Sequence, residues 1–190
     1  MKKNIGLVLV LALVIIFAVT QLSNWIEQSK AIKDEMLGYD VKLGEEVSLQ
    51  QGEPAPNFTL HNLQGEALTL EQLKGKKVIL NFWATWCGPC KKEMPHLQKY
   101  YEQYAKEQNV EIVGVNLTYT RDQEEAIAQF IKSHELTFPI VLEKTEEVAR
   151  QYEILTIPST FMLDTEGNIQ RQIIGPLNTE SLVAYMQEID

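Results

Sequence analysis

The feature that most constrains this chain is its pair of cysteines, Cys87 and Cys90, which directly follow a strongly apolar run. The run over 78–83 has the length and the β-branched and aromatic content of a buried strand. Because the chain has no third cysteine, a scaffold held by several disulfides is excluded. A bond between these two thiols would close a minimal loop, which stabilises a fold little. The pair therefore indicates chemistry rather than structural stapling.

The spacing of the two thiols predicts a different role for each. A helix that begins at about Cys87 places this thiol at the helix N-terminus, where unpaired N–H groups and the helix dipole favour an anion. Cys87 is therefore predicted to be the attacking thiolate. Cys90 lies one helical turn further in, where it can attack a mixed disulfide as the resolving thiol. Pro89 at an early helical position fixes the backbone between them.

Other uses of two cysteines stay open as alternatives. A structural zinc site needs four ligands, and His61, His96 and His134 do not have the spacing of zinc ligands. A non-enzymatic chaperone for copper could use both thiols, although Pro89 in the spacer favours redox exchange. A thiol peroxidase of the peroxiredoxin group would need a proline as well as a threonine upstream, and only Thr85 is present. We expect neither a metal nor a cofactor.

The N-terminus carries a run without charges over 4–26, preceded by Lys2 and Lys3. As a helix this run would extend ~34 Å, enough to cross a bilayer. A cleaved signal peptide is the alternative, but the run has only a weak cleavage pattern, and Trp25 suits a membrane interface. We predict a membrane anchor over 1–23, with the N-terminus in the cytoplasm and the rest of the chain on the extracytoplasmic face.

The rest of the chain divides into a juxtamembrane spacer over 24–52 and one folded domain over 53–190. The residues after 23 carry 15 basic and 26 acidic side chains. This acidic balance would repel a phosphate backbone, so nucleic-acid binding is not expected.

Strand and helix patterns alternate along the predicted domain. The expected strands cover 58–60, 67–70, 78–83, 110–116, 138–143, 160–164 and 169–174, and the expected helices cover 87–106, 122–133, 145–152 and 178–189. Acidic residues at 122, 124, 125, 146 and 147 suit the first turns of helices. The alternation predicts an α/β fold with a mixed sheet and helices on both faces.

Several motifs together resemble the thioredoxin superfamily, and within it the membrane-anchored TlpA/ResA-like thiol-disulfide oxidoreductases of bacteria. The resemblance covers about 53–190, and its motifs are GEPAPNFTL at 52–60, NFWATWCGPC at 81–90, KKEMP at 91–95 and IPSTF at 157–161. It implies a thioredoxin-like sheet with the active-site disulfide at the start of a kinked helix. It also implies an added N-terminal hairpin and a β-α insertion, for which 110–133 is the candidate.

The resemblance further implies a cis peptide bond between Ile157 and Pro158, across from the thiols. A cis proline there would leave the Ile157 backbone open to an extended substrate peptide, a local form of strand addition. The predicted substrate-binding residues are therefore Trp86, Gly88, Pro89, Ile157 and Pro158.

The chain departs from the family pattern at two positions. Asn81 replaces the buried aspartate of thioredoxin and cannot shuttle a proton. The resemblance implies that Glu93 takes this role beside Cys90; the alternative is that Glu93 is a first-turn carboxylate favoured by the helix dipole. Some ResA-like proteins carry a glutamate where this chain has Gly88. The partner proteins and the redox potential of those relatives are therefore not carried over to this chain.

The predicted function is exchange of disulfides with exported proteins outside the cytoplasm. The Gly-Pro spacer is that of thioredoxin, whose potential of about −270 mV lies far below that of the oxidant DsbA at about −120 mV. A reductant is therefore favoured over an oxidant. The resemblance implies a membrane electron donor of the CcdA type and a cysteine pair of apocytochrome c as substrate, hence a role in cytochrome c maturation.

Overall fold

The computed structural model describes Ile16, Thr20, Gln21, Ser23, 39–41 and 49–189. The chain divides into two compact units, 1–36 and 37–190. The described residues of the first unit are helical. Among all described residues, no helix combines the length and the apolar character needed to cross a membrane. Apart from these four helical residues, the predicted anchor lies outside the described residues, as does most of the predicted spacer.

The second unit is built on one eight-stranded sheet with the order β1-β8-β7-β4-β5-β6-β2-β3. The strands are β1 (Tyr39–Val41), β2 (Thr59–His61), β3 (Ala67–Thr69), β4 (Lys77–Trp83), β5 (Val110–Asn116), β6 (Ile140–Leu142), β7 (Ser159–Leu163) and β8 (Ile169–Ile174). Strand β4 pairs in parallel with β5 and antiparallel with β7. The sheet is therefore mixed, and β4, which leads to the cysteines, lies in its interior.

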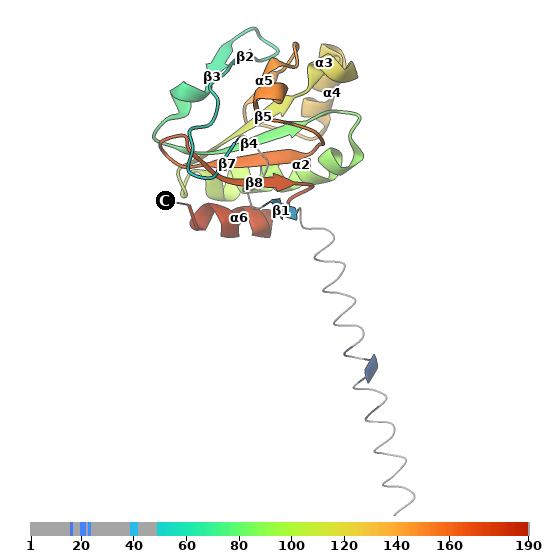
Figure 1. The fold of residues 1–190 in the computed structure, drawn as a ribbon. Coiled ribbons are helices and arrows are strands. Elements are labelled where there is room, and N and C mark those ends of the chain that lie inside the picture. Colours follow the sequence, from blue (N-terminus) through green and yellow to red (C-terminus); the bar gives the residue numbers. More distant parts are fainter. Residues whose placement is uncertain (1–15, 17–19, 22, 24–38, 42–48, 190) are drawn as a thin grey trace, which may run out of the picture. The chain divides into compact units, whose positions relative to one another are not determined.

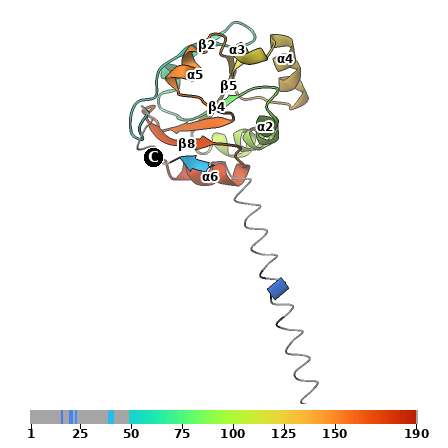
Figure 2. The same cartoon turned by 45° about the vertical axis from the view of Figure 1, so that its right-hand side comes forward.

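In the part of this unit that the structure describes, seven helical segments connect or cover these strands. They are η1 (Leu70–Leu73), α2 (Gly88–Tyr100), the π-helical turn η2 (Tyr101–Ala105), α3 (Thr118–Arg121), α4 (Glu124–Ser133), α5 (Glu147–Gln151) and α6 (Thr179–Gln187). Figures 1 and 2 show α2 and α6 on one side of strands β7 and β8, and α5 on the other side.

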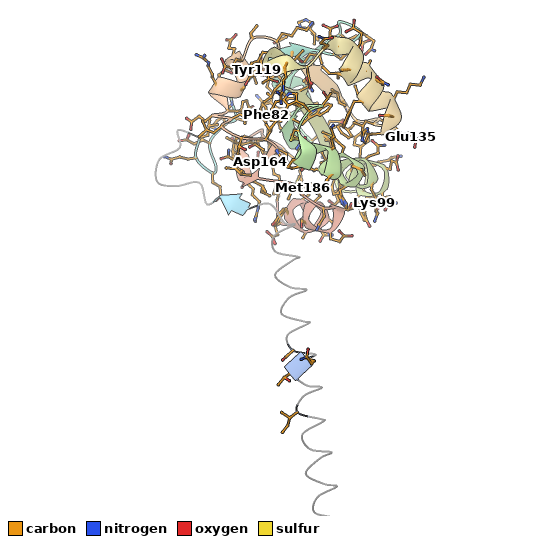
Figure 3. The ribbon with its side chains drawn as sticks, turned by 90° about the vertical axis from the view of Figure 1, so that its right-hand side faces the viewer. Phe82, Lys99, Tyr119, Glu135, Asp164 and Met186 are labelled. Carbon is orange, nitrogen blue, oxygen red and sulfur yellow. A yellow bond between two sulfur atoms is a disulfide. The ribbon has the colours of Figure 1, made fainter. Side chains whose placement is uncertain are left out.

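A hydrophobic core lies on each face of the sheet, because successive side chains of the central strands point in opposite directions. Ile79 joins a cluster with residues of α2, α4 and α6, including Met186. Leu80 and Phe82 join a second cluster with the β2-β3 hairpin and with Tyr152, which follows α5. Figure 3 labels one member of each cluster, Phe82 and Met186. The first of these clusters fixes β4 and the start of α2 against each other.

The predicted mixed α/β fold is confirmed, including the N-terminal hairpin and the exact bounds of β5 and β8. Two differences concern the helices. The helix predicted over 87–106 changes to a π-helical turn after Tyr100, which keeps Tyr100 buried and packs Tyr101 and Tyr104 against the same core. The helix predicted over 122–133 is preceded by the separate turn α3 and begins at Glu124.

Strand β1 lies within the segment predicted as a spacer and was not expected. It pairs antiparallel with β8 and adds an edge strand to the sheet.

Candidate active site

The two cysteines lie where β4 passes into α2, as predicted. Cys87 is the N-cap residue of α2, and its Sγ accepts a hydrogen bond from the Cys90 N–H at 3.2 Å. The two residues form a disulfide. Cys87 is 5% exposed, whereas Cys90 is fully buried. Cys87 is thus the sulfur nearer to solvent, at the end of the helix that favours a thiolate.

The Ile157–Pro158 peptide bond is cis, which confirms the expectation from the family resemblance. The Ile157 carbonyl oxygen lies 3.7 Å from Cys87 Sγ. A backbone acceptor is therefore placed beside the sulfur that a partner would approach.

A groove of about 430 Å³ opens beside the disulfide. Four of the five predicted substrate-binding residues line it, namely Trp86, Gly88, Pro89 and Ile157, whereas Pro158 contributes the cis bond. Their part in binding stays a prediction.

Two apolar side chains of the groove are open to solvent. Leu155 is 97% exposed and Trp86 is 40% exposed. Tyr119, labelled in Figure 3, lines the same groove from α3. Exposed apolar groups of this size mark contact surfaces, so the disulfide lies at the edge of a surface suited to an apolar segment.

Glu93 lies behind the cysteines and is fully buried. Its Oε1 accepts a hydrogen bond from the Leu177 N–H at 3.2 Å, and its Oε2 accepts one from Asn81 Nδ2 at 3.3 Å. Burial outweighs these two bonds and raises the pKa of the Glu93 carboxyl to about 8. A carboxyl with this pKa can both hold and release a proton near neutral pH.

The alternative interpretation of Glu93, a first-turn carboxylate stabilised by the helix dipole, is wrong. Because α2 begins at Gly88, Glu93 lies in its second turn and points into the interior.

Asn81 connects Glu93 to the strand that follows the cis proline. Its Nδ2 also donates to Thr160 Oγ1 at 3.0 Å, while its Oδ1 is buried without a partner among the described residues. An unpaired buried oxygen lowers the stability of the folded state. Such costs are common at functional sites. The amide thus links the Glu93 carboxyl to Thr160 of β7.

One functional candidate was assigned wrongly from the sequence. Asp122 is not in the first turn of a helix but between α3 and α4, where it accepts the Thr85 N–H at 2.7 Å. The acidic residues around 122 are typical of a helix start in the sequence. The hydrogen bond of Asp122 to Thr85, two residues before Cys87, is a tertiary contact that the sequence pattern does not indicate. Leu155 was missed because an apolar residue in a loop carries no periodic signal.

Within the part of the chain that the structure describes, no three His, Cys, Asp or Glu residues lie together in a group suited to a metal ion. His96 is half-buried, and its Nδ1 lies 3.4 Å from Thr179 Oγ1.

Comparisons with known proteins agree with this site. The AhpC/TSA family matches residues 51–172. The thiol-disulfide oxidoreductase ResA of Bacillus cereus is 40% identical over 141 residues, covering 74% of this chain and 79% of the relative. The sporulation thiol-disulfide oxidoreductase A of Bacillus subtilis is 39% identical over 131 residues, covering 69% of this chain and 78% of that protein.

Solved structures give the same result. The crystal structure of StoA from Bacillus subtilis superposes with a TM-score of 0.61 at 38% identity, covering 69% of this chain and 96% of StoA. A putative thiol:disulfide interchange protein DsbE from Chlorobium tepidum gives a TM-score of 0.64 at 27% identity, covering 74% and 96%. The chain therefore belongs to the thioredoxin-like AhpC/TSA family and is a thiol-disulfide oxidoreductase of the ResA and StoA type.

Proposed function

We propose that the protein is a membrane-anchored reductant of disulfides in exported proteins, acting on the extracytoplasmic face through Cys87 and Cys90. The observation that carries this proposal is the contrast between the two sulfurs. Cys87 borders an open groove and lies 3.7 Å from the Ile157 carbonyl oxygen, while Cys90 is buried behind it.

In the reduced enzyme, the Cys87 thiolate attacks one sulfur of the substrate disulfide. An S–S bond forms to Cys87, and the other substrate sulfur leaves as a thiolate that takes up a proton. The substrate segment lies in the groove lined by Trp86 and Leu155, and its backbone pairs with Ile157.

Cys90 then attacks Cys87 Sγ, which forms the enzyme disulfide and releases the second substrate sulfur as a thiolate. Glu93 accepts the proton that Cys90 loses in this step. Two electrons pass from the enzyme to the substrate, so each turnover requires reduction of the enzyme again. A membrane donor of the CcdA type would supply these electrons, and a haem-binding cysteine pair of an apocytochrome c is the proposed substrate class.

The deciding measurement is the equilibrium potential of the Cys87/Cys90 pair against a dithiol buffer of known potential. A reductant is expected to lie near thioredoxin at about −270 mV. A value near that of DsbA, at about −120 mV, would contradict the proposed direction.

Attachment and orientation need a separate experiment with the full chain. After cell fractionation, the product is expected in the membrane fraction, with the second unit open to protease added from outside. Recovery of a soluble form that begins near Gln21 would show cleavage instead of anchoring.

A further inference from the structure

The turn between β4 and the active-site helix is held by three consecutive residues from the connection between β5 and α4. Trp86 Nε1 donates to Thr120 Oγ1 at 3.2 Å. The Arg121 guanidinium lies over the Trp86 ring, with its Cζ 4.3 Å from the ring centroid. Asp122 binds both the backbone N–H and the hydroxyl of Thr85. The connection therefore clamps the two residues that precede Cys87.

Asp122 makes the strongest part of this clamp. Its Oδ2 accepts the Thr85 N–H at 2.7 Å and Asn116 Nδ2 at 2.9 Å, and its Oδ1 accepts the Thr85 hydroxyl. Asp122 is only 9% exposed. Hydrogen bonds to an ionised carboxylate are stronger than those between neutral groups, and partial burial protects them from water.

The clamp is anchored on the central sheet rather than on a mobile loop. Asn116 is fully buried at the end of β5, opposite Trp83 of β4, and its Oδ1 accepts the Thr118 hydroxyl at 2.9 Å. The Leu117 N–H also donates to the Trp83 carbonyl oxygen at 2.9 Å. The position of Asp122 is therefore fixed relative to the strand that carries the cysteines.

We infer that Asp122 is a positioning residue that sets where the Cys87 sulfur lies. Thr85 is followed at once by Trp86 and Cys87, and the Cys87 N–H donates back to the Ala84 carbonyl oxygen at 3.2 Å. Fixing Thr85 fixes this turn, and with it the approach of Cys87 to its partner beside Ile157. This inference rests on the proposed role of Cys87 as the attacking thiol.

Two substitutions of Asp122 separate the effect of its hydrogen-bond geometry from the effect of its charge. In Asp122→Asn, the amide oxygen can replace Oδ2 and accept from Thr85 N–H and Asn116 Nδ2. The amide NH₂ can replace Oδ1, because the Thr85 hydroxyl can accept as well as donate. Asp122→Asn thus removes the charge and keeps the hydrogen bonds, whereas Asp122→Ala removes both.

The experiment measures the second-order rate of disulfide exchange and the thiolate pKa of Cys87 by iodoacetamide alkylation, for the full chain in its reduced form. Asp122→Ala is expected to slow exchange about ten- to a hundred-fold and to shift the thiolate pKa, because a small displacement of a reacting group has a large effect on rate. Asp122→Asn is expected to stay within about three-fold of wild type, because its hydrogen bonds hold the same geometry.

Asp164→Ala is the matched control. Asp164 is equally exposed at 9%, accepts hydrogen bonds from Glu166, Asn168 and Gln170, and follows β7 at the end opposite Pro158. It is expected to lower the melting temperature without changing the exchange rate or the thiolate pKa. If it slows exchange as much as Asp122→Ala, the effect is general loss of stability and the inference is overturned.

Further outcomes would also overturn the inference. The first is that Asp122→Ala keeps the wild-type exchange rate and the wild-type thiolate pKa of Cys87. The second is that Asp122→Asn and Asp122→Ala slow exchange equally, which would assign the effect to charge.

If Asp122→Ala does not fold, Thr85→Val decides the question, since it removes only the hydrogen bond of the Thr85 hydroxyl. Its exchange rate is expected to fall about three- to ten-fold, the effect of one hydrogen bond, and a wild-type rate would contradict the inference. If instead Cys87 is not the attacking thiol, the result differs from all of these, because disulfide exchange would then survive in Cys87→Ser.

Discussion

The surroundings of Cys87 and of Cys90 differ sharply although the two residues are one helical turn apart. Cys87 borders a groove with exposed apolar side chains and follows a turn that is held by polar contacts. Both cysteines belong to the same buried core, but Cys90 is fully buried, and the polar groups Glu93 and Asn81 are fully buried as well. The proposed roles in partner contact and proton transfer are therefore separated by burial: Cys87 lines the open groove, whereas Glu93 is enclosed.

The largest expected effect comes from replacing each cysteine in turn by serine, which tests this contrast directly. Cys90→Ser keeps the attacking thiol and removes the resolving one, so mixed disulfides with partners are expected to accumulate on Cys87. Cys87→Ser should trap almost none, because Cys90 is buried. Non-reducing gels followed by mass spectrometry measure the trapped species. Equal trapping by both variants would break the assignment.

A second test concerns the proton carrier and uses the oxidised enzyme. When a small dithiol reduces the Cys87–Cys90 bond, Cys90 leaves as a thiolate, and in the proposed mechanism Glu93 donates a proton to it. Because the pKa of Glu93 is about 8, the carboxyl is protonated below that pH and loses its proton above it. The rate, divided by the concentration of attacking thiolate, is therefore expected to fall as pH rises through about 8.

In Glu93→Gln the corrected rate should be independent of pH in this range and lower than wild type below pH 8 by about ten- to a hundred-fold, a modest share of what general acid catalysis contributes. Glu125→Gln, an exposed carboxylate of α4, is the control and should keep the wild-type profile. Superimposable profiles of wild type and Glu93→Gln would remove Glu93 from the reaction.

The smallest expected effect concerns the groove. Leu155→Ser should weaken binding of an extended disulfide-containing peptide about ten-fold, equivalent to ~1.4 kcal/mol, because the side chain can bury its area only against a partner. Its reaction with a small disulfide should be unchanged, and its melting temperature should hold, since Leu155 is 97% exposed. Leu155→Met keeps an apolar group and should bind like wild type. Equal loss with the small disulfide would contradict a role in partner contact.

The parts that could be predicted from the sequence are those determined by short-range chemistry. The apolar run over 110–116 is buried on both faces and gives the exact bounds of β5, and Cys87 lies at a helix start as the motif requires. The cis bond before Pro158 followed from the family resemblance and not from the residue alone.

The missed parts depend on contacts between distant segments. The acidic residues at 122, 124 and 125 are typical of a helix start, but Asp122 lies outside the helix, where it accepts three hydrogen bonds from Thr85 and Asn116. The π-helical turn after Tyr100 depends on where three tyrosines meet the core. Strand β1 exists through its pairing with β8, a backbone interaction that its own three residues do not encode.

The short edge of the sheet at β3 has a consequence for the proposed exchange with extended client chains. The outermost strand β3 is three residues long, so this edge offers only a few backbone groups to a foreign strand. An extended client would therefore find little to pair with at this border, where it would associate without reacting. The backbone acceptor at Ile157 lies beside the Cys87 sulfur, where pairing would lead to the proposed exchange. Such an arrangement would favour release over aggregation.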